Sequence, residues 1–222
     1  MGKEKFAVVR ALLFDLDGTL IDSKQDIVNA VNAMLRDMGR QTLPLDTVAS
    51  YVGHGAPRLV ASTLGPASSE AERSEGVHLF LRHYEQHKLD YTRAYPGVEE
   101  GLAALADHPM AVLTNKPTQA SQEIVSGLGL KKYFRAVYGG DSFPKKPDPS
   151  GALSVLREFG VEPKQAAMVG DSDVDIQTAR NAGMLAVGVR YGFGKHDEAT
   201  NPADVYVDSL AELAFLGNQR VR

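Results

Sequence analysis

Two aspartates separated by one residue follow an apolar segment near the start of the sequence. The segment reads LLFDLDGTLIDS, and Gly18 and Thr19 come directly after Asp15 and Asp17. Two carboxylates this close are costly unless a cation, a proton or open water compensates their charge. An isolated Asp-Gly pair is typical of a strand that ends in a turn, because Asp supplies turn hydrogen bonds. The other polar residues of the chain must therefore decide between a turn and a site.

Further carboxylates occur in GDSDVD, which follows the apolar run AAMV. This segment contributes Asp171, Asp173 and Asp175, so at least four carboxylates could gather at one place. Their mutual repulsion requires a hard cation, and Mg²⁺ takes oxygen ligands while keeping several waters. An EF-hand loop is excluded because Ile176 stands where that loop needs a glycine. We therefore expect a magnesium site that is shared with a bound ligand.

Two other segments carry groups suited to a phosphate. LTNKP ends an apolar run with Thr114 and Asn115, and a hydroxyl, an amide and the N–H groups of a following helix can hold phosphate oxygens. In KKPDP, Pro147 restricts the preceding residue to an extended conformation and so gives Lys146 a defined direction. A lysine there could neutralise both the carboxylates and a phosphate. Alone, each signal is also typical of an ordinary polar loop.

Apolar runs that alternate with helical patterns predict the fold. The expected strands are 7–15, 110–115, 136–141, 166–171, 185–192 and 204–207, and the expected crossover helices are 118–129, 149–160 and 173–182. Runs that are apolar on both sides indicate a parallel sheet covered on both faces, a doubly wound, Rossmann-like α/β core. In such folds ligands bind beyond the carboxyl ends of the strands. Those ends carry Asp15, Thr114, Asp141 and Asp171, which should meet at one site.

One interval departs from this alternation. Between Asp17 and the run at 110–115 lie about ninety residues without a convincing strand, far more than a crossover needs. The pattern predicts an inserted helical domain over 20–92, leaving 1–19 and 93–222 as the core. Its first helix should bury one face, its later helices should cover 44–64 and 69–90, and Ser23 with Asp26 resembles a capping box. The predicted buried face consists of Ile27, Val31, Met34, Leu35 and Met38.

Composition limits the class of protein. The formal net charge of −4 over 222 residues argues against nucleic acid as the partner, since binding it usually needs a basic face. No apolar run approaches the roughly 20 residues that span a bilayer, so no membrane partner is expected. The absence of cysteine excludes disulfides, thiolate metal sites and a thiol nucleophile. A cytoplasmic enzyme or binding protein fits best, and the sequence does not define its oligomeric state or turnover rate.

Taken together and in order, the four polar motifs resemble those of the haloacid dehalogenase-like hydrolases. They are Asp15-Leu-Asp-Gly-Thr-Leu, Thr114-Asn-Lys, Lys146-Pro and Gly170-Asp-Ser-Asp-Val-Asp175. The resemblance covers nearly the whole chain, and the inserted helices resemble the helical cap of that family. DLDGTLIDS, TNKP and GGDSFPKKPDP are most similar to its phosphoglycolate phosphatase branch.

The resemblance implies roles for the carboxylates. Asp15 would be the nucleophile that forms an aspartyl-phosphate. Asp17 would first act as an acid that protonates the leaving group, and then as a base that takes a proton from water. Mg²⁺ would be held by Asp15, the backbone carbonyl of Asp17 and Asp171, while Asp175 would steady metal-bound water. This chemistry would make the proximity of Asp15 and Asp17 tolerable.

The resemblance also implies roles for the phosphate-binding and cap residues. Thr114, Asn115 and Lys146 would hold the phosphoryl oxygens. Gly53-His54-Gly55 falls where relatives carry a substrate loop, although the same residues would suit a plain helix–helix turn. One turn later, Arg58 would either meet a substrate carboxylate or face solvent.

The expected function is Mg²⁺-dependent hydrolysis of a small phosphate monoester, with phosphoglycolate as the preferred candidate among possible substrates. A sugar-phosphate phosphatase, a pyrophosphatase and a phosphoglucomutase-like mutase remain alternatives within the family. A non-catalytic phosphate- or metal-binding module is the alternative of a different class. It is disfavoured because every reactive position is intact.

We predict that Asp15→Asn abolishes turnover and leaves the fold intact. An amide removes both the nucleophilic oxygen and a charge that would face the metal, and such changes lower rates by several orders of magnitude, on the order of several kcal/mol. Phosphate release and circular dichroism measured on the purified variant check this. Substantial activity in a clean preparation would remove Asp15 from the mechanism.

Overall fold

The sheet at the centre of the molecule is entirely parallel. The computed structural model describes residues 9–194 and 196–214. Six strands lie in the order β5-β4-β1-β6-β7-β8. Their bounds are Ala11–Phe14 (β1), Met110–Leu113 (β4), Ala136–Tyr138 (β5), Ala166–Gly170 (β6), Leu185–Val189 (β7) and Val205–Val207 (β8). The predicted doubly wound α/β core is therefore confirmed.

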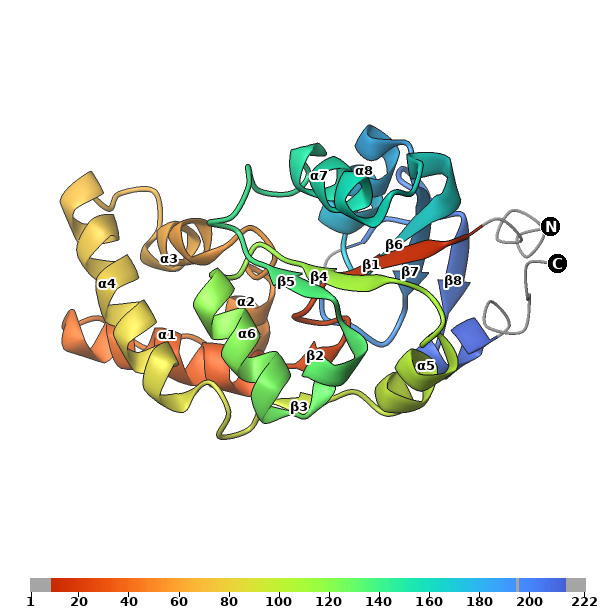
Figure 1. The fold of residues 1–222 in the computed structure, drawn as a ribbon. Helices are drawn as coiled ribbons and strands as arrows, with labels where there is room; N and C mark the ends of the chain where they lie inside the picture. Colours follow the sequence, from red (N-terminus) through yellow and green to blue (C-terminus); the bar gives the residue numbers. More distant parts are fainter. Residues whose placement is uncertain (1–8, 195, 215–222) are drawn as a thin grey trace, which may run out of the picture.

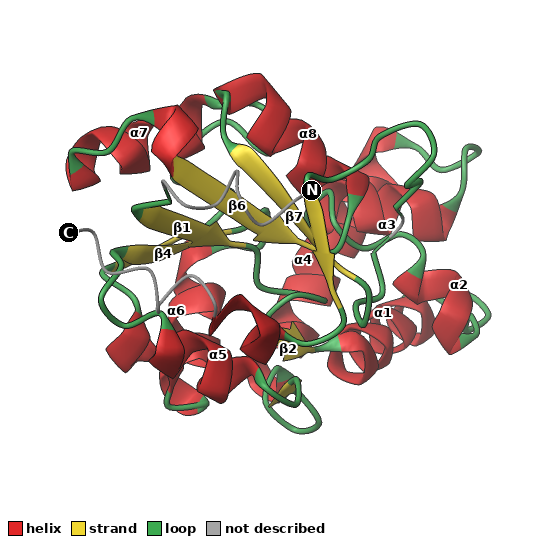
Figure 2. Cartoon of the chain, turned by 90° about the vertical axis from the view of Figure 1, so that its right-hand side faces the viewer, coloured by secondary structure: helices red, strands yellow, loops and turns green. Residues whose placement is uncertain are grey.

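Helices cover both faces of this sheet, because its strands are apolar on both sides. In β1, Leu12 and Phe14 belong to one buried cluster and Leu13 to the other. Figure 2 shows helices on both faces of the sheet. They are α7 (Ser150–Phe159) and α8 (Asp173–Ala182) on one side, and α5 (Val98–Ala104) and α6 (Thr118–Gly127) on the other. Single 3₁₀ turns occupy Leu130–Tyr133, Pro163–Gln165 and Leu210–Leu213.

Except for β8, which ends at residue 207 as predicted, the observed strands are shorter than the predicted ones at their carboxyl ends. The run predicted at 110–115 pairs only to residue 113, and the run at 166–171 pairs only to residue 170. Where pairing stops, the chain turns out of the sheet and presents polar residues at its edge. The predicted strand at 7–15 begins at Ala11, and its residues 7 and 8 lie outside the described residues.

Four helices form a separate layer in the segment between β1 and β4 (Figure 1). They are α1 (Lys24–Asp37), α2 (Leu45–Ala49), α3 (Ala56–Leu64) and α4 (Glu70–His87), and α4 packs against both α1 and α3. Hereafter we call these four helices and their loops the cap. The predicted apolar face of α1 is buried except at Met38, which lies beyond the helix end and is half-buried. None of the helices in the described ranges is long and apolar enough to cross a membrane.

Two short strands, which the sequence pattern did not reveal, join the cap to the core. β2 (Ile21–Asp22) and β3 (Arg93–Ala94) pair antiparallel where the chain enters and leaves the cap. They lie close to the boundaries predicted at 20 and 92. Two residues each are too few to show a strand period, which explains why the pattern missed them.

The predicted capping box at Ser23 and Asp26 is wrong. The Ser23 side chain makes no capping hydrogen bond and donates instead to the Asp17 carboxylate. Asp26 is buried and accepts hydrogen bonds from the N–H groups of Tyr91 and Thr92 and from the Thr92 hydroxyl. Partners far away in the sequence therefore replace the local cap. Asp26 ties the first cap helix to the segment that returns to the core.

We predict that Asp26→Ala lowers the free energy of unfolding by about 3 kcal/mol, because it strands buried N–H donors at Tyr91 and Thr92. Urea unfolding of the variant and the parent measures this. Asp37→Ala is the matched control, since that carboxylate pairs with Arg82 and His83 at the surface and should matter much less. Equal losses in both variants would contradict the role given to Asp26.

Candidate active site

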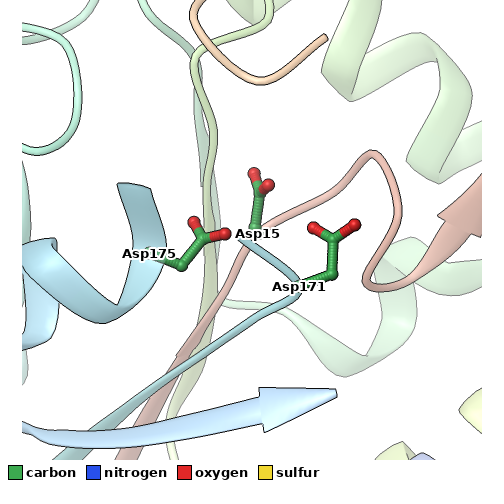
Figure 3. Close-up of side chains that lie close together, drawn as sticks. All are labelled: Asp15, Asp171 and Asp175. Carbon is green, nitrogen blue, oxygen red and sulfur yellow. The ribbon is translucent and has the colours of Figure 1, made fainter. Parts of the chain in front are cut away.

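Three carboxylates from two loops converge at the carboxyl edge of the sheet. Asp15 directly follows β1, Asp171 directly follows β6, and Asp175 lies in the first turn of α8. Figure 3 shows the three carboxylates gathered at this edge, and carboxylate oxygens of all three lie within 4.8 Å of one another. All three residues are buried. Neighbouring strand ends have thus brought together residues that are up to 160 positions apart.

Lys146 supplies positive charge to this cluster. Its Nζ atom lies 2.8 Å from Asp15 Oδ1 and 2.6 Å from Asp175 Oδ1. Burial lowers the pKa of Lys146, but the two carboxylates outweigh burial and raise it. The ammonium therefore stays charged throughout the ordinary pH range and offsets part of the repulsion between Asp15 and Asp175.

Asp175 also caps the helix on which it lies. Its Oδ2 accepts hydrogen bonds from the Ser172 N–H at 3.2 Å and the Ser172 hydroxyl at 2.6 Å, which completes a capping box. The neighbouring Asp173 points elsewhere, and it is half-buried and paired with His196 at 3.0 Å. Asp173 and Asp175 are two residues apart in the first turn of the helix and point in different directions. Asp175 therefore belongs to the cluster, and Asp173 does not.

Asp141 does not join the cluster, in contrast to the expectation that all four strand ends would meet. Its carboxylate is exposed and accepts hydrogen bonds from the N–H and the hydroxyl of Thr118. It therefore caps the beginning of α6. β5 ends at Tyr138, so Asp141 lies three residues beyond the strand and outside the edge that the strand end defines.

The cluster has the properties of a site for a divalent cation. Burial raises the pKa of Asp15 to about 6 against the lowering effect of Lys146, and burial with the nearby Asp175 and Asp15 raises that of Asp171 to about 8. Asp15 Oδ1 is buried and, despite the nearby Lys146, has no aligned hydrogen-bond partner among the described residues. A cation bound between these groups would stabilise their ionised forms.

The loop after Asp15 is pressed against Asp171. Gly18 has φ +87°, and a Cβ atom there would lie 2.0 Å from Asp171 Oδ2. Only glycine permits this conformation and this approach. The Asp17–Gly18 backbone therefore lies beside the Asp171 carboxylate. This fits a cation held by Asp15, Asp171 and the Asp17 backbone carbonyl, as the resemblance implied.

Lys116 is a site residue that the sequence reading did not identify. Its Nζ atom lies 2.7 Å and 2.9 Å from the two carboxylate oxygens of Asp17, and 4.5 Å from the centre of the Tyr84 ring in cap helix α4. Burial lowers the pKa of Lys116, but Asp17 and Tyr84 outweigh burial and raise it. Its only sequence signal was a lysine directly after Thr114-Asn115, and nothing local connected it to Asp17.

Asn115 connects the core to the cap. Its side-chain Nδ2 donates to the backbone carbonyls of Gly53 at 2.9 Å and Lys146 at 3.1 Å, and its Oδ1 accepts from the Lys146 N–H at 2.9 Å. The side-chain amide thus holds Lys146 and the cap loop in place. A phosphate-binding role for Asn115 stays a prediction, and Thr114 lies buried beside it at the end of β4.

A cavity of about 430 Å³ lies between the cap and the edge of the sheet. Asp15, Asp17 and Thr114 line its core side, and Gly53 and Gly55 line its cap side. Apolar side chains of the cap complete the wall, namely Ile27, Val52, Leu59, Phe80 and Leu81.

His54 and Arg58 are not among the residues that line this cavity. His54 is half-buried, and its pKa is lowered by burial and by the neighbouring Arg58, which is exposed. The structure therefore brings the glycines of the predicted substrate loop to the cavity wall. The two basic residues do not line it, although the Asp175 carboxylate partly opposes the lowering of the His54 pKa.

Comparisons with known proteins show the family to which the chain belongs. The family model described as haloacid dehalogenase-like hydrolase matches residues 12–189. A phosphoglycolate phosphatase of Neisseria meningitidis is 41% identical over 217 residues, covering 92% of each chain, and one of Chromobacterium violaceum is 38% identical, covering 92% of this chain and 95% of the relative. The crystal structure of a predicted phosphoglycolate phosphatase from Haemophilus somnus has a TM-score of 0.89 and 32% identity, covering 94% of this chain and 98% of that one.

The raised pKa values predict how pH and a cation act on stability. Asp15 and Asp171 have folded pKa values of about 6 and about 8, above the ordinary value near 3.8, so the folded protein binds more protons than the unfolded chain. Without a divalent cation, their contribution should destabilise the protein increasingly as pH rises from about 4 to about 8. Mg²⁺ binds the ionised carboxylates, so its stabilising effect should grow over the same window.

Melting temperatures in chelator and in Mg²⁺ at pH 5 and pH 8 measure both effects. The control is Asp171→Asn, which should lose most of the response to Mg²⁺ because the amide carries no charge. A response that is larger at pH 5 than at pH 8 would contradict this account of the cluster.

Proposed function

Because the chain belongs to the haloacid dehalogenase-like hydrolases, we propose that it hydrolyses a small phosphate monoester, 2-phosphoglycolate, through an aspartyl-phosphate on Asp15. The observation that carries the proposal is the placement of two carboxylates with different surroundings in one cavity wall. Asp15 is buried beside Lys146, and Asp17 is held by Lys116. The relatives named above are phosphoglycolate phosphatases, which supports the choice of substrate.

Asp15 is the nucleophile of the proposed reaction. Its carboxylate attacks phosphorus, the bond from phosphorus to the ester oxygen breaks, and the phosphoryl group is transferred to Asp15. Lys146 lies 2.8 Å from Asp15 Oδ1 and can share its ammonium with a phosphoryl oxygen. The buried Thr114 hydroxyl and Asn115 complete the phosphate site at the end of β4.

Asp17 is the general acid and general base of the proposed reaction. An alkoxide leaves poorly, so Asp17 protonates the ester oxygen as the bond breaks and then takes a proton from the water that hydrolyses the aspartyl-phosphate. Contacts from Ser23 and Lys116 fix the direction of its carboxylate. Because these contacts come from the beginning of the cap and from the end of β4, the position of Asp17 depends on how the cap sits on the core.

The carboxylate cluster fits a magnesium ion. Asp15, Asp171 and the Asp17 carbonyl would hold it, with Asp175 positioned beside them through Lys146 and Ser172. When bound, Mg²⁺ neutralises charge and so lets an anionic nucleophile approach an anionic phosphate.

The cavity also supports a small substrate whose leaving group faces the cap. The core would bind the phosphoryl group of any ester, so discrimination has to come from groups around the leaving portion. When the cap closes on the core, its apolar wall excludes water from the aspartyl-phosphate.

Phosphate release from a panel of esters tests the proposal. With Mg²⁺, 2-phosphoglycolate should have a kcat/KM at least about tenfold above those of sugar phosphates and pyrophosphate. Thorough chelation should abolish turnover. Ca²⁺ should inhibit, because its looser coordination can capture Asp15 bidentately and spoil the geometry of attack.

Other outcomes of the panel point to the alternatives. Isomerisation of a sugar phosphate without phosphate release would indicate a mutase, and faster turnover of pyrophosphate would indicate a pyrophosphatase. Binding of phosphate esters without any turnover would indicate a non-catalytic module. Each of these results overturns the proposed function.

A further inference from the structure

A substrate with a carboxylate needs a cation in the cavity, and few of the lining residues offer one. Among the described residues that line the cavity, Lys116 and Arg82 carry the permanent positive charges. Arg82 is half-exposed and pairs with Asp37 at 2.9 Å. Lys146 is committed to Asp15 and Asp175 and does not line the cavity. Among these cations, Lys116 is therefore the one that lines the cavity and contacts Asp17.

The surroundings of Lys116 hold its ammonium in one place. The side chain of Lys116 is buried, with 6% of its surface exposed. Its Nζ atom contacts both oxygens of Asp17 on one side and the face of the Tyr84 ring on the other. The Tyr84 hydroxyl is buried and has no aligned hydrogen-bond partner in the described part of the chain. A polar group is thus available in the cap next to the ammonium, where a small anion could reach both.

Bond lengths allow a substrate carboxylate to reach this position. The ester oxygen must lie about 2.8 Å from an Asp17 oxygen to receive its proton. In phosphoglycolate one carbon separates the ester oxygen from the carboxylate carbon, so the carboxylate oxygens lie about 3 Å from the ester oxygen. Lys116 Nζ is 2.7 Å from Asp17 Oδ2. A carboxylate at that separation falls within direct reach of the ammonium, without any large movement of the chain.

Resting on the proposed function, we propose that Lys116 determines specificity by binding the carboxylate of the leaving group. The ammonium exchanges its partner, from Asp17 in the free enzyme to the substrate carboxylate in the complex. That exchange releases the Asp17 carboxyl group toward the ester oxygen. The ligand class is phosphate esters of 2-hydroxy acids, in which one carbon separates the ester oxygen from the carboxylate.

Comparison of two substrates in Lys116→Met tests this role. 2-Phosphoglycolate and ethyl phosphate have similar size, but ethyl phosphate has a methyl group in place of the carboxylate. The ratio of their kcat/KM values in the full-length enzyme with Mg²⁺ should favour phosphoglycolate in the parent and fall by at least about tenfold in the variant. Lys116→Arg, which retains the charge, should keep most of the preference.

The matched control is Lys132→Met, which removes an exposed lysine from a surface turn and should leave the ratio unchanged. If both substrates lose the same factor in Lys116→Met, the lysine acts only by orienting Asp17 and the inference fails. If the ratio falls in a His54→Ala, Arg58→Ala double variant and not in Lys116→Met, recognition lies in the cap loop and the inference also fails.

A measurement on the parent enzyme covers the case that Lys116→Met does not fold. The phosphate ester of 3-hydroxypropionate carries its carboxylate one methylene further from the ester oxygen. Its kcat/KM should be at least about tenfold below that of phosphoglycolate. Equal turnover of both would overturn the role of Lys116 and leave the proposed function standing. A parent enzyme that does not favour phosphoglycolate over ethyl phosphate would instead refute the proposed function.

Discussion

Three buried carboxylates, two of which pair with one buried ammonium, form the constraint on which the rest of the structure depends. Asp15, Asp171 and Asp175 are desolvated together, and Lys146 compensates only part of their charge. Such a group is unstable in isolation, because uncompensated charge in a low-dielectric interior is costly. It persists here because neighbouring parallel strands end at the same edge and fix the backbone from which the side chains project. A site of this kind is poised to bind a cation.

Contacts from the surrounding structure hold these carboxylates in place. The capping box of α8 orients Asp175, the backbone N–H groups of Phe193 and Gly194 hold one oxygen of Asp171, and Gly18 allows the first loop to approach it. These contacts come from loops and helix beginnings, while the sheet behind them is apolar. The division is typical of doubly wound folds, in which a rigid core presents loops that carry the chemistry.

The cap is coupled to the core through polar contacts at two places. Beside the site, Asn115 bonds the carbonyl of Gly53, and Lys116 stacks on Tyr84. Near the return to the core, Lys88 pairs with Glu85 of α4 and Glu123 of α6, each at 2.7 Å. The contacts beside the site involve the same short segment after β4 that carries the proposed phosphate-binding residues. Movement of the cap would therefore directly change the positions of Asp17 and Lys146.

The sequence by itself determined the doubly wound core and most of the carboxylate cluster. Apolar runs and helical spacing are local properties, and the topology of parallel strands then places Asp15, Thr114 and Asp171 at one edge. Only the tertiary structure decided which polar residues pair. The link between Lys116 and Asp17 and the absence of Asp141 from the cluster could not be read from spacing. The reason is physical: such pairs depend on how loops from distant segments cross and on which neighbour a side chain meets there, and neither leaves a periodic signal.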